Sequence, residues 1–537
     1  MTAPGGEGRW AVFLGAYAVL CLAGFVVLDR VFDGLWVFYA PGSLAVGWAL
    51  AGLVITAAFA AGRWRPPSPP EGAIPGVALA SLAVSLVIAA LVLDRFINSA
   101  DEYAYLFEAR TWLAGRLWNP PPPLGQGMAA DYTWVKDGKW VGQYPPGWPL
   151  WLAAAELVGL PAWAVDSLMG GASILLLWRL ARRRAEPGFA TLVVAAYAAS
   201  PFFLFNAGSM HSHLPAAVTA LLAMNLAEAA LERKSAPLAA ATGAAIGYLA
   251  MVRYTTAPLV AAPLLAVLLT RGGAQRPKLL AAAAAGILPM MAALLAYHWA
   301  ITGDPLKPVY YFANRTLDHL YFDADGMRRA AIISFWRLVE LAEWTAPSLV
   351  PLYLLAVAAK ARAGTLAWAD SVFPLFALMF LFYPFDGANR YGPRYWFDAF
   401  PFLALTVASA GPAFRQLGGE ALARRLAALA VVAALTALPF LASRYHTIVR
   451  ERQDVFDLVA AQALVNAVVL VESDPGDQWT MEADDLARNG IDADGPVLYA
   501  RADLTTVAQI RAKIPGRSVY VYRKGESHTS GILSELP

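Results

Sequence analysis

Long apolar runs recur along most of the chain, and they limit what it can fold into more than any other feature. A helix needs about 20 mostly apolar residues to cross a bilayer. The 537 residues are 58% hydrophobic and only 15% charged, whereas a soluble domain carries about a quarter charged residues. We therefore predict an all-α polytopic membrane protein with about 13 transmembrane helices. The expected spans are 10–28, 36–61, 74–96, 162–181, 188–205, 214–231, 238–253, 256–270, 279–300, 345–360, 367–384, 396–413 and 425–443.

The runs 10–28 and 148–160 differ from ordinary transmembrane spans. The run 10–28 resembles a signal peptide, but no small-residue cleavage site closes it, so we expect a retained span. The run 148–160 is short and starts with Trp148-Pro149, which favours a partly inserted or interfacial helix. The single cysteine, Cys21, excludes an intramolecular disulfide and a cysteine-based metal site. The net charge of +2 gives no sign of a nucleic-acid partner.

Lysine and arginine are concentrated in alternate short loops, and this bias predicts the orientation. We expect these loops to be cytoplasmic, with the N-terminus on the same side; they contain Arg63, Arg65, Arg182 to Arg184, Arg233, Lys234, Arg271, Arg276, Lys278, Lys360, Arg362, Arg415, Arg424 and Arg425. The long loops 97–161, 301–344 and 385–395 would then face outward, as would the tail. No GxxxxGK or GxGxxG motif offers a nucleotide site. An enzyme of this layout would act outside the cytoplasm, where lipid-linked rather than nucleotide-activated substrates are expected.

The tail, 447–537, differs in pattern from the rest of the chain. Strand-like runs alternate with helix-like stretches, which predicts a small extracytoplasmic α/β domain. The expected strands are Val468–Val471, Val497–Tyr499 and Val519–Tyr522, and the expected helices are Asp454–Leu464 and Thr505–Lys513. The tail carries no recognisable catalytic signature.

The first outer loop opens with Asn98-Ser99-Ala100-Asp101-Glu102-Tyr103-Ala104-Tyr105-Leu106-Phe107-Glu108-Ala109-Arg110. As a helix, this stretch would place Asp101, Tyr105, Glu108 and Trp112 on one face, with an apolar face of Leu106, Ala109, Leu113 and Leu117. Such a helix is expected to lie at the membrane surface. Ser99 and Glu102 also form a capping-box pattern, which explains Glu102 without catalysis. Asp101 is only partly explained by the helix dipole, so it is the stronger candidate for chemistry.

Asp101, Glu102 and Tyr105 form an Asp-Glu-x-x-Tyr motif just outside a span, and the motif resembles the signature of the C-type glycosyltransferases. The likeness is to protein O-mannosyltransferases and lipid A aminoarabinose transferases. The loop ends in Gln143-Tyr144-Pro145-Pro146-Gly147-Trp148-Pro149-Leu150, similar to the family's Pro-Pro-Leu stretch, with Gly147 in place of Leu and Tyr144 in place of the aminoarabinose transferases' Lys. Looser matches are 247–254, 297–305 and 390–395. The resemblance covers about 94–413, and it implies two extra N-terminal helices in 1–73, a membrane core in 74–446 and the tail domain.

The resemblance implies transfer of a sugar from a polyprenyl-phosphate donor to a lipid, glycan or protein acceptor, with inversion of the anomeric configuration. The charge bias predicts that this happens at the outer face of the membrane, and the Ala-rich sequence is typical of a bacterial inner-membrane protein. Asp101 would be the base, with Glu102 beside it. Arginines would hold the phosphate leaving group. The substrate-binding candidates are Tyr105, Glu108, Tyr144, His211, His213, Arg253, Tyr254, Arg390, Arg394 and Tyr395. His211 and His213 could share a metal, but the sequence names no further ligand, so a divalent metal stays open and no cofactor is assigned.

Other classes remain open from the sequence. A secondary transporter would place ionisable residues at mid-membrane in repeated halves, and here few ionisable residues lie in spans and no repeat is visible. A polysaccharide polymerase or ligase also has large outer loops with Arg and His. A non-catalytic scaffold for the tail domain is the remaining alternative.

Overall fold

The computed structural model describes residues 64–66, 68–312, 323–345, 348–383, 391–472, 483–525 and 530–537. The predicted spans 10–28 and 36–61 lie outside these residues. The chain divides into two compact units, which are described separately. The helical unit takes in Met1–Leu86, Asp166–Pro289 and Asp318–Leu441, and the mixed unit takes in Val87–Val165, Met290–Leu317 and Ala442–Pro537.

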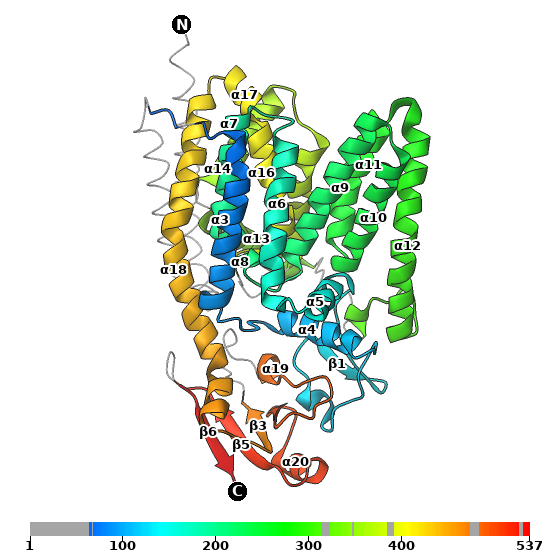
Figure 1. Cartoon of the computed structure of the whole chain (residues 1–537), viewed down its shortest axis with the longest axis vertical. Helices are drawn as coiled ribbons and strands as arrows, with labels where there is room; N and C mark the ends of the chain where they lie inside the picture. The colour runs from blue at the N-terminus through cyan, green and yellow to red at the C-terminus, as the bar shows by residue number, and fades with distance from the viewer. Residues whose placement is uncertain are drawn as a thin grey trace. The chain divides into compact units, whose positions relative to one another are not determined.

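The helical unit is built from apolar helices that account for most of the predicted spans (Figure 1). Its helices, of which α12 and α18 continue into the mixed unit, are α3 (Ile74–Val87), α6 (Val165–Ala181), α7 (Pro187–Ala199), α8 (Pro201–Ala207), α9 (His213–Arg233), α10 (Ala236–Val252), α11 (Thr256–Arg271), α12 (Arg276–Thr302), α13 (Ala324–Trp344), α14 (Leu349–Arg362), α15 (Val372–Phe380), α16 (Phe400–Ser409), α17 (Gly411–Gln416) and α18 (Glu420–Ala461). Short helical turns join or extend them: η2 (Glu71–Ala73), η6 (Gly273–Gln275), η8 (Trp368–Ser371) and η9 (Arg394–Ala399). The turns η3 (Ile88–Val92), after α3, and η5 (Ala162–Ala164), before α6, belong to the mixed unit.

Within the described residues, six helices are long and apolar enough to cross a membrane, or seven if the bent pair α7–α8 is one span. The six are Glu71–Val92, Ala162–Ala181, His213–Arg233, Gly273–Thr302, Arg394–Gln416 and Glu420–Ala461. A mostly helical membrane protein is therefore confirmed, while the predicted number of spans is not. Helix α13 lies where the sequence predicted a long loop, 301–344.

The predicted span 188–205 is broken in two. Helix α7 ends at Ser200, whose hydroxyl accepts a hydrogen bond from the Phe203 N–H and so caps α8. Pro201 has no N–H to continue the first helix and fits the first position of the second. The two helices bend by 57° at this point.

Two glycines allow helices α10 and α12 to approach closely. A Cβ atom on Gly243 would lie 1.9 Å from the Ala283 carbonyl oxygen, and one on Gly286 would lie 1.9 Å from the Ala240 oxygen. Both distances are far inside van der Waals contact, so only glycine fits. Small residues at helix contacts are typical of membrane proteins, where close backbone packing replaces the hydrophobic effect.

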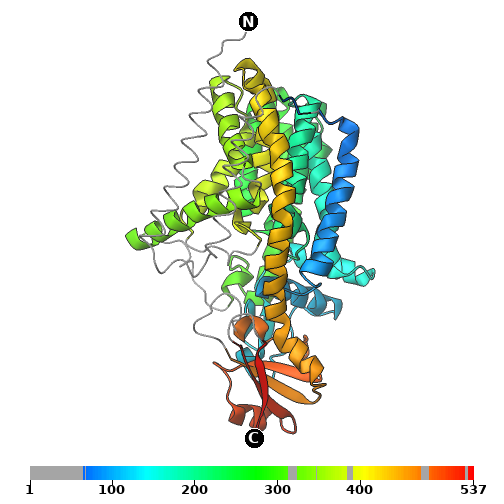
Figure 2. The same cartoon turned by 90° about the vertical axis from the view of Figure 1, so that its left-hand side faces the viewer.

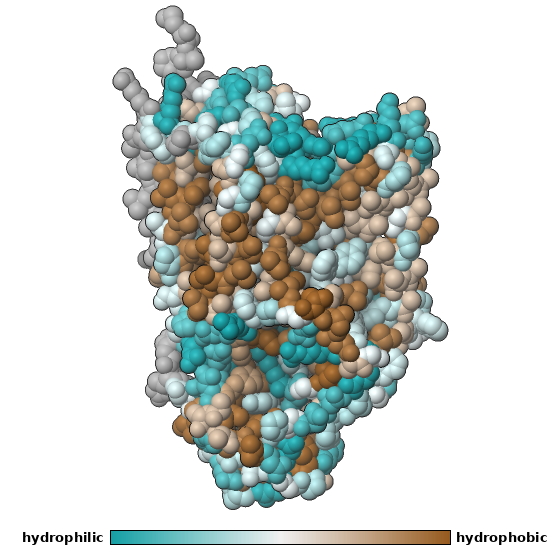
Figure 3. Space-filling view, in the orientation of Figure 1, coloured by the Kyte–Doolittle hydropathy of each residue, from teal (hydrophilic) through white to brown (hydrophobic). Residues whose placement is uncertain are grey.

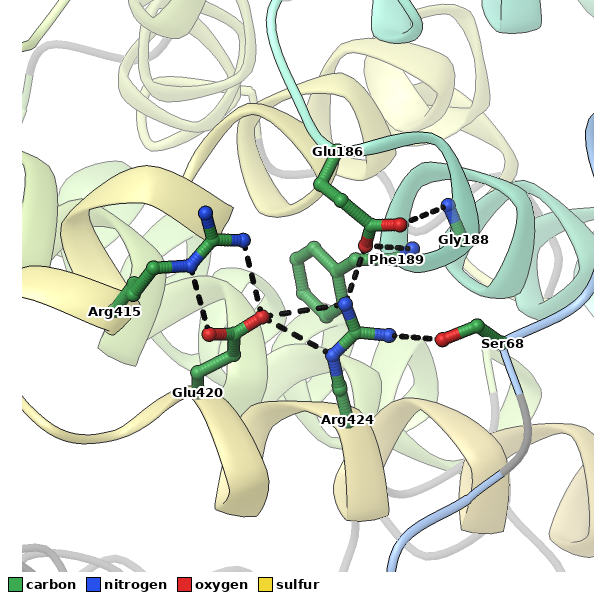
Figure 4. A network of polar contacts seen from close by, with 7 residues as sticks. All are labelled: Ser68, Glu186, Gly188, Phe189, Arg415, Glu420 and Arg424. Atoms are coloured by element: carbon green, nitrogen blue, oxygen red, sulfur yellow. Dashed lines mark hydrogen bonds and ion pairs between the residues drawn. The ribbon is translucent and has the colours of Figure 1, made fainter.

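An ion-pair network joins three separate parts of the helical unit (Figure 4). Arg424 of α18 contacts Glu420 on the same helix, Glu186 at the start of α7, and the Ser68 hydroxyl. Glu186 in turn accepts hydrogen bonds from the Gly188 and Phe189 N–H groups, 2.8 and 3.0 Å long, and so caps α7. The network fixes the start of α7 against α18.

Figure 3 shows apolar side chains gathered over the flanks of the helices and hydrophilic ones at one end of the helical unit. Large exposed apolar side chains include Leu79 of α3, Leu175 of α6, Leu222 of α9 and Leu288 of α12. Helix sides that expose leucine in this way fit a lipid environment rather than water.

The mixed unit combines a helix pair, a hairpin and a small sheet. Its helices are α4 (Ala100–Leu113), α5 (Gly147–Leu157), α19 (Ala483–Leu486) and α20 (Val507–Lys513), with the short turns η4 (Gly125–Met128) and η7 (Val309–Tyr311) and the last part of α18. Its strands are β1 (Thr133–Lys136), β2 (Lys139–Gly142), β3 (Ala467–Val471), β4 (Val497–Arg501), β5 (Ser518–Arg523) and β6 (Ile532–Leu536). β1 and β2 form an antiparallel hairpin.

The C-terminal strands form one sheet in the order β4-β3-β5-β6, in which β4, β3 and β5 run parallel and β6 is antiparallel. The three predicted strands are thus confirmed, and β6 is an additional edge strand. The predicted helix at Asp454–Leu464 is the end of α18, which runs unbroken for 42 residues through position 446. Figure 2 shows the strands beside this end of α18.

The central strand β3 is buried along its whole length because both faces of the sheet are covered. Val468 and Leu470 face a core formed with α4, η4 and the hairpin. Val469 and Val471 face a second core, which contains Val455 of α18. The sheet therefore packs directly against the helix that carries the acidic motif.

Candidate functional site

The acidic motif lies at the start of α4, as the sequence predicted. Ser99 is the N-cap, and its hydroxyl accepts the Glu102 N–H at 3.2 Å. Glu102 is buried, with 1% of its surface exposed, whereas Asp101 is half-buried. Of the two adjacent carboxyl residues, Asp101 is the more exposed.

Asp101 accepts a hydrogen bond from the Tyr144 hydroxyl. Burial, and then the negative charge of Asp101, raise the pKa of Tyr144 well above its usual value. The phenol therefore stays protonated and donates to the carboxylate. Tyr105 packs on the Tyr144 ring with centroids 4.4 Å apart, so the motif's tyrosine holds the donor in place.

The Tyr132 ring meets the Tyr144 ring in an edge contact, with centroids 5.9 Å apart. Its backbone is in the left-handed region, with a φ of 61°. A bulky residue rarely adopts this conformation, and strain of this kind is concentrated at functional sites. The Gln143 N–H donates to the Tyr132 carbonyl at 3.0 Å and ties this turn to the segment that carries Tyr144. Sequence reasoning missed Tyr132, because backbone strain leaves no residue pattern.

Glu108 lies two turns further along α4 and is 3% exposed. The Tyr297 hydroxyl donates to its Oε1 at 3.1 Å. Burial raises the pKa of Glu108 well above its usual value, because the charged form loses solvation. Gly142 makes the room, because a Cβ there would lie 2.5 Å from the Glu108 Cγ. Glu108 therefore joins α4 to α12 and β2 and is shielded from solvent.

A second group of polar residues, the histidine–arginine cluster, lies in the helical unit; it comprises the buried His211, His213, Arg394 and Asp398 and the half-buried Arg253. Arg394 Nη1 lies 2.8 Å from His211 Nε2. A guanidinium is always protonated and donates, so His211 Nε2 accepts and this imidazole is neutral. Its Nδ1 lies 3.3 Å from the Ser209 hydroxyl. This hydrogen bond joins Arg394, at the start of η9, to the turn before α9.

Asp398 of η9 joins the rest of this cluster. Its Oδ1 lies 2.8 Å from His213 Nδ1, and its Oδ2 lies 2.9 Å from Arg253 Nε. The Thr256 hydroxyl also donates to Asp398. His213 starts α9, Arg253 ends α10 and Thr256 starts α11, so one buried carboxylate ties three helix ends together.

Sequence reasoning missed Asp398, because the residue lies inside a predicted span, 396–413. The available signal was an ionisable side chain within an apolar run, which is a functional hypothesis by default. Arg337 of α13 was missed too, since its helix was expected to be a loop. Its guanidinium donates to the carbonyl oxygens of Phe380 and Tyr383 at 2.9 and 3.1 Å and is fully buried.

Three further predicted site residues are Tyr395, Tyr254 and Arg390. Tyr395 stacks on Phe380 with centroids 5.4 Å apart, and the Arg394 guanidinium carbon lies 5.5 Å from the Tyr395 ring centre. Tyr254 is half-buried beside Arg253. Arg390 lies outside the described residues. Over the described part of the chain, no group of three or more His, Cys, Asp or Glu side chains is placed to hold a metal ion.

No protein-family model matches the sequence, and no curated protein does either. Among solved structures, the chain resembles ArnT from Cupriavidus metallidurans bound to undecaprenyl phosphate, with 14% identity, a TM-score of 0.54, and coverage of 83% of this chain and 93% of that one. The apo form of the same protein gives 14% identity, a TM-score of 0.52, and coverage of 83% and 92%. The chain has the C-type glycosyltransferase fold.

A weaker likeness is found to the oligosaccharyltransferase of Archaeoglobus fulgidus in complex with Zn and sulfate, with 13% identity, a TM-score of 0.47, and coverage of 83% of this chain and 68% of that one. The likeness to ArnT takes in 83% of this chain and 93% of that protein. The resemblance expected from the Asp101 motif is confirmed at the level of the fold.

Proposed function

We propose that this protein transfers a sugar from a polyprenyl-phosphate donor to a hydroxyl of a lipid, glycan or protein acceptor. The observation that carries the proposal is the half-buried Asp101, held by the Tyr144 hydroxyl at the first turn of α4. A carboxylate that is partly open to solvent, and oriented by a donor that stays protonated, has what a general base needs. The C-type fold supports the same class of reaction.

In the proposed reaction, Asp101 accepts the proton of the acceptor hydroxyl as that oxygen attacks the sugar's anomeric carbon. The bond from that carbon to the phosphate oxygen breaks, and polyprenyl phosphate leaves with the bonding electrons. A single displacement of this kind inverts the anomeric configuration. Glu102 is buried beside Asp101, so the proton is proposed to go to Asp101 rather than to Glu102.

The histidine–arginine cluster is proposed to hold the phosphate. Guanidinium groups bind phosphate oxygens in pairs and stabilise the charge that develops on a leaving group. Arg394 and Arg253 are the two guanidiniums of the cluster, and the neutral imidazole of His211 orients the first of them. Asp398 keeps Arg253 and His213 in position. Arg390 is a further candidate from the sequence.

The proposed location is the outer face of a bacterial inner membrane. The bias of Lys and Arg toward the loops at 182–184, 233–234 and 271–278 supports a cytoplasmic N-terminus. The acidic motif and the tail would then lie outside, where lipid-linked donors replace nucleotide sugars.

The test is transfer in vitro from radiolabelled polyprenyl-phosphate sugars, with the purified protein, a membrane extract as acceptor, and Asp101→Asn beside the wild type. We expect label to move with the wild type only. Transfer by both proteins would support the transferase class and show that Asp101 is not the catalytic base. No transfer from any donor would reject the proposed function.

A secondary transporter is the second candidate, and one observation favours it. Helices α7 and α8 form a broken span, bent by 57°, directly before the buried His211. Transporters place broken helices at their substrate sites. Uptake into vesicles without any transfer of label would support this alternative.

A further inference from the structure

One face of helix α4 carries Asp101, and another, buried face packs against the C-terminal sheet. Tyr103 and Phe107 of this face share a core with Val468, Leu498 and Val521 of the C-terminal sheet. Met128, Ala129 and Trp140 of the first outer loop complete the same core. The helix is thus packed between the proposed reaction site and the tail.

Asn489 of the tail connects three segments around this core. Its carbonyl oxygen accepts the Tyr103 hydroxyl at 2.6 Å. Its side-chain amide donates to the carbonyls of Met128 and Tyr499, both at 2.8 Å, and accepts the Tyr499 N–H at 2.9 Å. The side chain therefore holds its own backbone at the position where Tyr103 needs an acceptor. Burial raises the pKa of Tyr103 above its usual value, so its hydroxyl remains a donor.

The preceding residue, Arg488, reaches the other side of the motif. Its guanidinium donates to the Ile97 carbonyl, two residues before the N-cap of α4. The guanidinium carbon lies 5.1 Å from the centre of the Phe96 ring and 6.0 Å from that of Tyr103. Asp485 fixes the arginine from within the tail, at 2.8 Å.

Two consecutive tail residues thus hold the chain at positions 97 and 103, and Asp101 lies between them. We propose that Arg488 and Asn489 are positioning residues that fix the first turn of α4 and with it the Asp101 carboxylate, so that the tail domain is a working part of the reaction site. The catalytic part of this inference rests on the proposed function. Small misplacements of a reacting group reduce rates by up to about a hundredfold.

The test uses the full-length protein with Tyr103→Phe, which removes one hydroxyl, and Arg488→Gln, which removes the guanidinium. The matched control is Arg116→Ala. Arg116 also joins the α4 region to the tail, through Asp492 at 2.7 and 3.1 Å, but it lies beyond the far end of the helix and is partly exposed.

Two readouts are measured for each variant: hydrogen–deuterium exchange of the amides of residues 100–106, and kcat and KM of sugar transfer. We expect both test variants to speed exchange in this segment severalfold and to lower kcat by about tenfold or more, with KM for the acceptor nearly unchanged. Arg116→Ala should leave exchange there and kcat as in the wild type.

The exchange measurement decides the positioning role without any assay of activity. Unchanged exchange in Tyr103→Phe and Arg488→Gln would overturn it. Faster exchange with wild-type kcat would also overturn it, because the held turn would then not matter to the reaction. A wild-type protein that transfers no sugar would reject the proposed function instead, and the exchange data would still show whether the tail holds α4.

Discussion

Three carboxyl groups of this chain are stabilised in different ways. Asp101 accepts from a phenol and is half-buried, Asp398 is buried among Arg253, His213 and Thr256, and Glu108 is buried with a raised pKa. These surroundings suit the proposed roles of Asp101 in the reaction and of Asp398 in positioning cations, while Glu108 joins elements of the mixed unit. The assignments lead to two predictions on single residues.

Glu108→Gln should make stability less dependent on pH. The folded-state pKa of Glu108 is raised above its ordinary 4.5, so its contribution is full below that pH and is lost as the pH rises toward the folded-state pKa. We expect the variant to gain in Tm relative to the wild type between pH 5 and pH 8, measured in detergent. The control is Glu156→Gln, whose carboxylate pairs with Arg110 near the surface at 3.3 Å. A Tm difference that is constant over this range would contradict the prediction.

Asp398→Asn should weaken binding of the donor and also lower the stability of the protein. Removing one partner of a buried ion pair costs about 3–5 kcal/mol, and here the carboxylate also orients two proposed phosphate ligands. Asp370→Asn is the matched control, since Asp370 forms a buried pair with Lys360 at 2.7 Å in the same unit. We expect both variants to lose Tm, but only Asp398→Asn to raise the KM for the donor. Equal KM values for the donor in the two variants would show that the histidine–arginine cluster does not take part in donor binding.

Candidate site residues that belong to a local sequence pattern could be predicted, whereas those recognised by contacts with distant parts of the chain could not. Ser99, Asp101 and Glu102 follow from a capping pattern within four residues, and Tyr144 from a short motif. The roles of Asp398 and Tyr132 depend on partners far along the chain or on backbone strain. No spacing rule in one sequence connects Asp398 to Arg253, because folding brings the two together.

Helices in this chain pack by close backbone contact as well as by apolar side chains. The pair Gly243 and Gly286 is the clearest case, since a methyl group on either would enter the carbonyl of the other helix. The ends of the helices were predicted within a few residues where Pro, Ser or charged residues mark them, as at α9 and α11. The break at Ser200 and the helix α13 were missed, because apolar content alone does not show a bend or distinguish a polar helix from a loop.

Gly243→Ala and Gly286→Ala should each lower the free energy of unfolding by about 1–3 kcal/mol, the usual cost of overpacking. Gly171→Ala in α6 is the control, because a Cβ there meets nothing within 4 Å and alanine favours helix. Thermal unfolding in detergent measures the difference. A Gly243→Ala variant as stable as Gly171→Ala would show that α10 and α12 do not pack at this point.

On the scale of the whole chain, composition predicted the class of protein and the pattern of apolar runs predicted the C-terminal strands, but neither predicted how the units are assembled. The mixed unit draws on three separated stretches of sequence, and α18 continues past the boundary expected at 446. At about 1.5 Å per residue its 42 residues extend about 63 Å, roughly twice the hydrocarbon thickness of a bilayer. Sequence separation hides such an assembly, since each stretch alone looks like a loop or a small domain.

The charge bias of the loops predicts a specific topology. A reporter enzyme that is active only outside the cytoplasm should be active when fused after Pro537 and inactive when fused within 182–185. A reporter that is active only inside should show the reverse. Equal activity of one reporter at both sites would reject the predicted orientation and with it the outer location of Asp101.

The shared core of α4 and the C-terminal sheet has a consequence for biosynthesis. Tyr103 and its acceptor on Asn489 are 386 residues apart, so at about 5–20 residues per second the ribosome needs roughly 20–80 s to supply the partner. Until then the first turn of α4 lacks its contacts with the tail. A chain that stops early, through a nonsense mutation or premature release, would carry every residue of the acidic motif yet lack the surface that fixes it. Completion of translation thus becomes a condition for an ordered motif.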